Sequence, residues 1–191
     1  MIRRPPRSTL SSSSAASDVY KRQLYKNILP DDLVNDLLKY YESYEPIDYG
    51  NFTQVEIDTQ HKLTNYMKDI VYKVTDHYFE LHDKTNQHPE PFALEGFRIK
   101  RYEPNKGSFP WHTDAGNIQN CTRFLALLFY LNNSEAGTKF EKTYVPAEKG
   151  SVVIFPPMWM FPHEGEMPKK EPKFIMSTYL HFMGVDKSRQ V

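Results

Sequence analysis

Two histidines and an aspartate in this chain have the types and spacing of metal ligands. His112 and Asp114 stand one residue apart in the stretch Trp111-His112-Thr113-Asp114, and His163 lies well beyond them. On a strand, residues two apart point to the same face, so His112 and Asp114 could reach one ion together. Two histidines and one carboxylate leave coordination positions open, which suits a non-haem Fe(II) that binds a co-substrate and O₂. The sequence therefore predicts that these three residues bind iron and are catalytic.

Lys173 adds weight to this interpretation, because a His-x-Asp pair alone is a weak signal in a chain with seven histidines. Lys173 begins a predicted strand ten residues after His163, and Ser177 lies on the same face of that strand. A cation inside a barrel could hold a carboxylate by a charge-assisted hydrogen bond. Taken alone, Lys173 would be interpreted as a solvated charge, since the residues before it are also basic.

Two helices are predicted ahead of the strands that carry these residues. Pro30-Asp31-Asp32 places acidic residues at a helix start, and the apolar residues up to Tyr41 recur at helical spacing. A second and longer helix is predicted over residues 58–81.

From Ala93 onward the sequence alternates between apolar and polar residues, as strands do. Strands are predicted at residues 97–102, 123–131, 143–145, 150–155 and 173–182. Turn signals between them include Asn132-Asn133, Ala136-Gly137 and Pro156-Pro157. Helices followed by a run of short strands predict a mainly β fold, a sandwich or barrel with the N-terminal helices packed on one sheet.

The ordered set of residues resembles the signature of the prolyl 4-hydroxylase-like Fe(II)/2-oxoglutarate-dependent oxygenases, including short bacterial and phage-type members. The resemblance lies in His-x-Asp, a distant histidine and a lysine ten residues later, and it covers residues 97–182. It implies a double-stranded β-helix, which is a jelly-roll or cupin-like barrel. It also implies a dioxygenase that hydroxylates an unactivated C–H bond and releases succinate and CO₂. Its cofactors would be Fe(II), 2-oxoglutarate and O₂, with ascorbate as a candidate reductant.

Further residues are similar to co-substrate ligands of that superfamily. Tyr102, ten residues before His112, stands where a tyrosine of related hydroxylases lines the co-substrate pocket. Tyr130, in Tyr130-Leu131-Asn132, matches the tyrosine that helps hold the distal carboxylate beside the basic residue. The resemblance therefore implies that 2-oxoglutarate binds to Lys173, Tyr130, Tyr102 and Ser177.

Three residues are candidates for contact with the primary substrate. Arg98 and Lys100 share the strand face of Tyr102 and would favour an anionic group, although a solvated sheet edge is the alternative. Trp159 precedes His163 and could contact substrate or form the pocket wall. The Gly-Gly-Glu-Thr that usually follows the family's Tyr-Leu-Asn is replaced here, at residues 135–138, by Glu-Ala-Gly-Thr. Peptidyl-proline and an amino-acid-like substrate therefore both stay open.

The first 23 residues differ in composition from the rest of the chain. They are rich in Ser, Arg and Pro, and they resemble the translation of a transposon-based sequencing-library adapter. We expect residues 1–23 to be an artefact without fixed structure. Residues 24–191 are expected to form one oxygenase domain, with a helical lead-in at 24–92 and the β-helix core at 93–183.

Charge and composition restrict the possible partners. Of 24 basic and 24 acidic residues, five basic and one acidic lie in the first 23, so residues 24–191 carry a formal charge of −4. That charge argues against nucleic acid as a partner. No apolar run approaches the roughly 20 residues of a membrane helix. The single cysteine, Cys121, argues against a disulfide framework and favours a reducing, cytoplasmic setting. A small molecule or a peptide is the expected substrate, and the oligomeric state is unknown.

Three other functions are compatible with parts of this pattern. A cupin-like metalloenzyme that does not use 2-oxoglutarate would have no need for Lys173 and Tyr130. A nucleic-acid dealkylating oxygenase fits poorly with the charge of −4, because such enzymes bind phosphates. A non-catalytic barrel that only binds a partner is disfavoured by the complete set of His112, Asp114 and His163.

Overall fold

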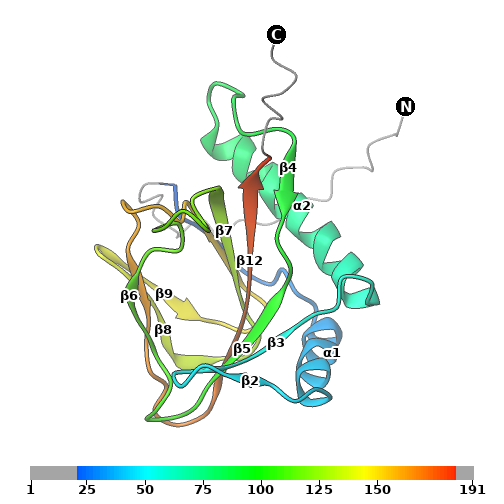
Figure 1. Cartoon of the computed structure of the whole chain (residues 1–191), viewed down its shortest axis with the longest axis vertical. Helices are drawn as coiled ribbons and strands as arrows, with labels where there is room; N and C mark the ends of the chain where they lie inside the picture. Colours follow the sequence, from blue (N-terminus) through cyan, green and yellow to red (C-terminus); the bar gives the residue numbers. More distant parts are fainter. Residues whose placement is uncertain (1–20, 184–191) are drawn as a thin grey trace.

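Two antiparallel sheets face each other in the computed structural model, which describes residues 21–183 (Figure 1). The larger sheet has eight strands in the order β1-β10-β7-β12-β5-β3-β2, with β4 paired to β12. These are β1 (Gln23–Tyr25), β2 (Ile47–Asp48), β3 (Thr53–Glu56), β4 (Phe92–Leu94), β5 (Arg98–Tyr102), β7 (Arg123–Tyr130), β10 (Val152–Phe155) and β12 (Lys173–Phe182). Most of the predicted adapter segment, residues 1–20, lies outside the described residues, whereas Gln23 is the first residue of β1.

The smaller sheet has four strands in the order β6-β11-β8-β9. They are β6 (Phe109–His112), β8 (Ser134–Phe140), β9 (Thr143–Ala147) and β11 (His163–Gly165). In the pairing of β6 with β11, His112 lies directly opposite His163. The two sheets form the double-stranded β-helix predicted from the sequence, and that prediction is confirmed.

Helices α1 (Asp31–Glu42) and α2 (Lys62–His82) cover the outer face of the larger sheet (Figure 1). Both were predicted, and the acidic first turn of α1 complements the helix dipole. Their apolar sides bury Val34, Leu37, Met67, Val71 and Val74 in one core with β7, β10 and β12. Neither helix combines the length and the apolar character needed to cross a membrane.

Strand β12 separates two environments, because successive side chains of a strand point to opposite faces. Met176 and Leu180 belong to the core beneath the helices. Ile175 and Tyr179 belong to a second cluster inside the barrel. Lys173 and Ser177, which have the same parity, line the barrel cavity. One ten-residue strand therefore builds both the core and one wall of the cavity.

The predicted turn at Ala136-Gly137 was wrong, because both residues lie within β8. The register of β8 against β9 shifts between Ser134 and Thr138. A Cβ atom on Gly137 would lie 2.2 Å from the carbonyl oxygen of Val145. The glycine therefore marks a close approach of two strands rather than a turn.

Strands β2 and β3 come from residues 24–92, which the sequence predicted as a helical lead-in. Thr53–Glu56 pairs with β5, and Ile47–Asp48 pairs with β3 at the edge of the larger sheet. These strands are only four and two residues long, too short to show the period-two alternation by which strands are predicted.

Candidate metal and co-substrate site

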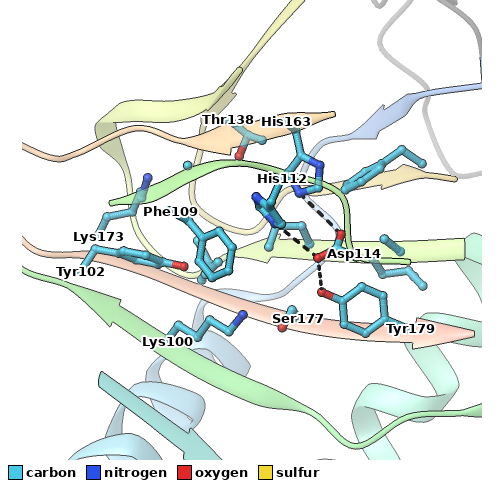
Figure 2. A pocket seen from close by; sticks show the side chains of 16 residues that line it. Lys100, Tyr102, Phe109, His112, Asp114, Thr138, His163, Lys173, Ser177 and Tyr179 are labelled. Atoms are coloured by element: carbon cyan, nitrogen blue, oxygen red, sulfur yellow. Dashed lines mark hydrogen bonds and ion pairs between the residues drawn. The ribbon is translucent and has the colours of Figure 1, made fainter. Parts of the chain in front are cut away.

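A cavity lies between the two sheets (Figure 2). Its walls come from both sheets, with Lys100 and Tyr102 on β5, His112 on β6 and His163 on β11. The three predicted metal ligands lie at one end of the cavity, and Lys173 lies at the other (Figure 2). A metal ion and a group bound to Lys173 could therefore occupy opposite ends of the same cavity.

The three predicted ligands converge on one point. His112 Nε2 lies 3.4 Å from Asp114 Oδ1, and His163 Nε2 lies 3.5 Å from Asp114 Oδ2. One potential ligand atom from each residue lies within 4.8 Å of the others. Within residues 21–183, no other set of three His, Cys, Asp or Glu residues meets that condition. Two imidazoles and one carboxylate with further positions open fit Fe(II).

The strand argument for His112 and Asp114 was wrong in one detail. Strand β6 ends at His112, and Asp114 lies in the turn that follows. The two side chains converge because the chain bends after β6, where Ala115 N donates to the carbonyl of Pro157 at 3.0 Å. That hydrogen bond ties the turn to the loop leading into β11.

Backbone carbonyls orient both imidazoles. His112 Nδ1 lies 2.8 Å from the carbonyl oxygen of Pro110, and His163 Nδ1 lies 3.2 Å from that of Phe161. A carbonyl oxygen only accepts, so Nδ1 carries the proton in each ring and Nε2 keeps its lone pair. Burial lowers the pKa of His163 to about 4, so this ring is neutral at pH 7. Both rings are therefore prepared to bind a metal through Nε2.

Asp114 is held by two residues that the sequence interpretation did not place in the metal site. The hydroxyl of Tyr179 donates to Asp114 Oδ1 at 2.9 Å, and Arg123 Nη1 donates to the Asp114 carbonyl at 3.2 Å. Burial alone would raise the pKa of Asp114, but His112 and His163 outweigh it and keep the pKa below its ordinary value. The carboxylate is therefore ionised and fixed in direction.

Lys173 is buried at the opposite end of the cavity, with 2% of its surface exposed. Its Nζ donates to the carbonyl of Glu166 at 2.5 Å and to that of Gly137 at 3.4 Å. Among the described residues no carboxylate forms an ion pair with it. Burial lowers its pKa to about 8, against the opposing charges of Glu166 and Glu135. A desolvated cation without a counter-ion fits the carboxylate of a ligand.

Ser177 and Thr138 add hydroxyl groups to this cavity. Ser177 Oγ is buried and has no hydrogen-bond partner among the described residues. Thr138 lines the cavity, and its Oγ1 accepts a hydrogen bond from the Tyr130 hydroxyl at 2.7 Å. Tyr102 also lines the cavity, with its ring centre 5.1 Å from Lys173 Nζ. Tyr130 itself lies behind Thr138, so the sequence interpretation missed Thr138 as the residue that faces the cavity.

The three candidate substrate residues occupy different places. Lys100 lines the cavity. Arg98 does not line it and is ion-paired with Glu95 and Glu56. Trp159 is 78% exposed and lies outside the cavity lining, in the loop between β10 and β11. The structure therefore brings one of the three to the cavity.

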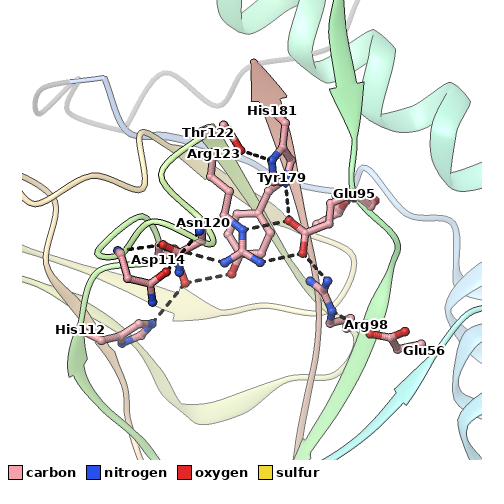
Figure 3. Close-up of polar contacts among 12 residues, drawn as sticks. Glu56, Glu95, Arg98, His112, Asp114, Asn120, Thr122, Arg123, Tyr179 and His181 are labelled. Atoms are coloured by element: carbon pink, nitrogen blue, oxygen red, sulfur yellow. Dashed lines mark hydrogen bonds and ion pairs between the residues drawn. The ribbon is translucent and has the colours of Figure 1, made fainter. Parts of the chain in front are cut away.

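Glu95 is the centre of an ion-pair network beside the metal ligands (Figure 3). Its carboxylate accepts hydrogen bonds from Arg123 at 2.7 and 2.9 Å and also pairs with Arg98. His181 Nε2 lies 2.5 Å from Glu95 Oε2. The pKa of Glu95 is lowered to about 2, because Arg123 and His181 outweigh the effect of burial. Arg123 and His181 lie far from Glu95 in the sequence, so no local pattern could reveal their contacts with it.

Comparisons with known proteins agree with this geometry. The family described as the 2OG-Fe(II) oxygenase superfamily matches residues 97–181. No curated protein matches the chain significantly by sequence.

Similar folds occur among solved structures. One is the viral collagen prolyl hydroxylase of Paramecium Bursaria Chlorella virus-1 with 2OG, at a TM-score of 0.67 and 18% identity, covering 89% of this chain and 100% of that one. Another is a Pseudomonas putida prolyl-4-hydroxylase, at a TM-score of 0.65 and 16% identity. That match covers 86% of this chain and 94% of the other. A third is a Trichoplax adhaerens prolyl hydroxylase with a hypoxia inducible factor peptide fragment, at a TM-score of 0.65 and 13% identity. That match covers 85% of this chain and 84% of the other. At these identities the likeness concerns the fold.

Proposed function

We propose that this chain, whose residues 97–181 match the 2OG-Fe(II) oxygenase superfamily, is a hydroxylase of the prolyl 4-hydroxylase type. One observation carries the proposal. A single cavity holds a His₂Asp cluster at one end and a buried lysine without a counter-ion at the other. A 2-oxo dicarboxylic acid has a metal-chelating group at one end and a carboxylate at the other, so it matches both.

His112, Asp114 and His163 would hold Fe(II) through two Nε2 atoms and one carboxylate. When bound, Fe(II), 2-oxoglutarate and O₂ supply an oxidant for an unactivated C–H bond, and the co-substrate leaves as succinate and CO₂. Backbone carbonyls keep both histidines in the metal-binding tautomer. Tyr179 and Arg123 fix the direction of Asp114. The chain thus supplies ligands that need little rearrangement on metal binding.

Lys173 would bind the carboxylate of 2-oxoglutarate that is remote from the metal. Thr138 and Ser177 offer hydroxyl groups along the same cavity, and Tyr102 forms its wall. Tyr130 would act as a positioning residue, because its hydroxyl donates to Thr138 rather than into the cavity. Donation from Tyr130 leaves the proton of Thr138 free to donate to a carboxylate.

We extend the proposal to the primary substrate. The three similar solved structures named above are prolyl hydroxylases, which favours a peptidyl-proline or an amino-acid-like substrate. Lys100 would contact this substrate from inside the cavity, and Trp159 would contact any part that extends beyond it. Ascorbate is proposed as the reductant that keeps iron in the Fe(II) state.

An anaerobic titration tests the proposal. 2-Oxoglutarate is added to the Fe(II)-loaded chain, and the visible charge-transfer band of a 2-oxo acid on ferrous iron is recorded together with calorimetric binding. We expect a saturable band in the wild type and in His88→Ala, a histidine outside the site. We expect no band in His163→Ala. Bound iron without a band would instead favour a cupin-like enzyme that does not use 2-oxoglutarate, and failure to bind iron would favour a non-catalytic barrel.

A further inference from the structure

A second lysine, Lys100, reaches into the same cavity from β5. The register of β5 against β12 places Lys100 opposite Ile175 and Tyr102 opposite Lys173. Lys100 therefore lies one step further along the barrel wall than Lys173, on the same face. Figure 2 shows its ammonium group turned toward Ser177 and the metal ligands, whereas Lys173 occupies the far end.

No described residue neutralises the charge of Lys100. Its ammonium forms no hydrogen bond and no ion pair within residues 21–183. Its nearest described neighbours include two aromatic rings, with the ring centres of Phe52 and Phe109 5.1 and 5.3 Å from Nζ. Aromatic faces attract a cation but satisfy none of its three donors. Burying a charge in this way is costly unless a ligand supplies the missing acceptor.

The other cations near Lys100 are already neutralised. Arg98 is paired with Glu95 and Glu56, and Arg123 is paired with Glu95 (Figure 3). Among the residues that the structure describes, Lys100 is therefore the cation available for an incoming anion on the metal side of the cavity.

The two lysines respond to different charges. Burial lowers the pKa of Lys100 to about 8, and the largest opposing influence is Asp114. For Lys173 the opposing charges are Glu166 and Glu135, at the other end. This agrees with the separation seen in Figure 2. One anionic group at Lys173 would leave Lys100 still without a partner.

We propose that Lys100 binds a carboxylate of the primary substrate beside the metal, which makes this chain a hydroxylase of free amino-acid-like acids rather than of uncharged peptide segments. The inference rests on the proposed function, because 2-oxoglutarate must occupy the Lys173 end. It assigns Lys100 a role in specificity: the ammonium selects the carboxylate and thereby places the carbon skeleton of the substrate against the iron.

A carboxylate fits this place better than other groups. Lys100 is a single point charge, and the neighbouring walls are Phe109, Tyr102 and Ile175. A phosphate dianion needs more cations than one lysine supplies. A neutral peptide segment would leave the buried ammonium without a counter-ion, a loss that disfavours such a substrate.

Calorimetry on the full chain loaded anaerobically with Fe(II) and 2-oxoglutarate tests this assignment. The probes are free L-amino acids and the matching carboxamides, which differ only in the charge of one group. The variants are Lys100→Met, which keeps the length without the charge, and Lys100→Arg, which keeps the charge. Lys142→Met, at an exposed lysine in the turn between β8 and β9, is the matched control.

We expect the wild type and Lys142→Met to bind at least one free acid about tenfold or more tightly than its amide, the effect of one hydrogen bond to a charged group. Lys100→Met should lose that preference, and Lys100→Arg should retain part of it. 2-Oxoglutarate affinity without substrate should change less than about threefold in Lys100→Met, well below one charge-assisted bond.

Several results would overturn the inference. They are binding of no free acid, equal binding of acids and amides, or an unchanged preference in Lys100→Met. Loss of 2-oxoglutarate binding in Lys100→Met would identify the bound carboxylate as that of the co-substrate, which also contradicts the inference. If 2-oxoglutarate fails to bind the wild type, the proposed function falls as well. If it binds but acids are not preferred, only the role of Lys100 falls.

Discussion

The two faces of the larger sheet bury different kinds of side chain, although the same strands build both. Beneath α1 and α2, the buried side chains of β7, β10 and β12 are mostly apolar, such as Phe129, Ile154 and Leu180, and the buried Thr178 hydroxyl donates to the carbonyl of Glu95. On the barrel side the same strands bury Ser177 without a partner and Lys173 without a counter-ion. Packing decides the composition of the first face, since a core is stabilised by close contact. The second face retains groups that cost free energy in the absence of a ligand.

This contrast teaches where function can be sought in such a barrel. A buried polar group without a hydrogen-bond partner in the protein needs an explanation, such as a catalytic role or a bound ion or water molecule. Here Ser177 without a hydrogen-bond partner, Lys173 without a counter-ion and the cluster of potential metal ligands all line one cavity. We therefore expect substitutions on the helix side to change stability and substitutions on the cavity side to change binding.

The largest effect is expected from the metal ligands. Asp114→Ala removes the anionic ligand of the triad and should lower 2-oxoglutarate turnover to background, a loss on the order of a thousandfold or more. The measurement is succinate formation together with iron content after gel filtration. Thermal unfolding serves as the control, because the fold should survive. Retained iron with full turnover in Asp114→Ala would remove this residue from the site.

A helix-side substitution should show the opposite behaviour. Leu180 is fully buried beneath the helices. Leu180→Ala is expected to lower the free energy of unfolding by about 2–5 kcal/mol, through lost burial and the cavity left behind. Urea unfolding gives that value, and iron and 2-oxoglutarate binding should stay unchanged at temperatures where the chain is folded. A selective loss of 2-oxoglutarate affinity would show that the two faces are not independent.

Lys173→Met should weaken 2-oxoglutarate binding by about 10–100-fold, because one charge-assisted hydrogen bond is lost. The pH dependence sharpens this test. The pKa of Lys173 is about 8 in the folded chain and 10.5 when unperturbed. Between these values the unfolded state binds the additional proton, so this group makes the ligand-free chain more stable as pH rises.

Two measurements check that pH prediction. The free energy of unfolding without ligand should rise less steeply between pH 8 and 10.5 in Lys173→Met than in the wild type. Affinity for 2-oxoglutarate should fall over the same range in the wild type, as the ammonium loses its proton. A decline of equal size in Lys173→Met would assign the effect to another group.

The smallest effect is expected from the network around Glu95. Glu95→Gln removes the charge that holds Arg123, which in turn donates to the Asp114 carbonyl. Residues that orient metal ligands typically alter affinity by about 10–100-fold, and we expect the lower end because Tyr179 still holds the carboxylate. Competition with a ferrous chelator measures this change. Glu56→Gln, which touches Arg98 alone within this network, is the control.

The sequence predicted the elements that have strong periodicity. Both helices and the long strands β7 and β12 follow from alternation or helical spacing, and β12 has the predicted bounds. Strands β2 and β11 are two and three residues long, and they form because neighbouring strands offer hydrogen-bond partners. Such pairing depends on residues far away in the chain, so a local pattern cannot predict it.

In the candidate site, too, some residues could be predicted from a local sequence pattern and others could not. His112, Asp114, His163 and Lys173 could be named because types and spacing carry chemistry, and the structure brings all four to one cavity. Thr138 and the Glu95 network could not, since a threonine and an ion pair have no local signature. Tyr179 lies on the face predicted for Lys173, but its bond to Asp114 required the fold.

The shared use of β12 restricts how this protein can change during evolution. A substitution affects one face at a time, so the core and the cavity can vary independently. A one-residue insertion or deletion within the strand would exchange the faces downstream of it, and Ser177 would be turned toward the helices while Met176 or Thr178 entered the cavity. The length of this strand should therefore be inherited far more strictly than the identity of most of its residues.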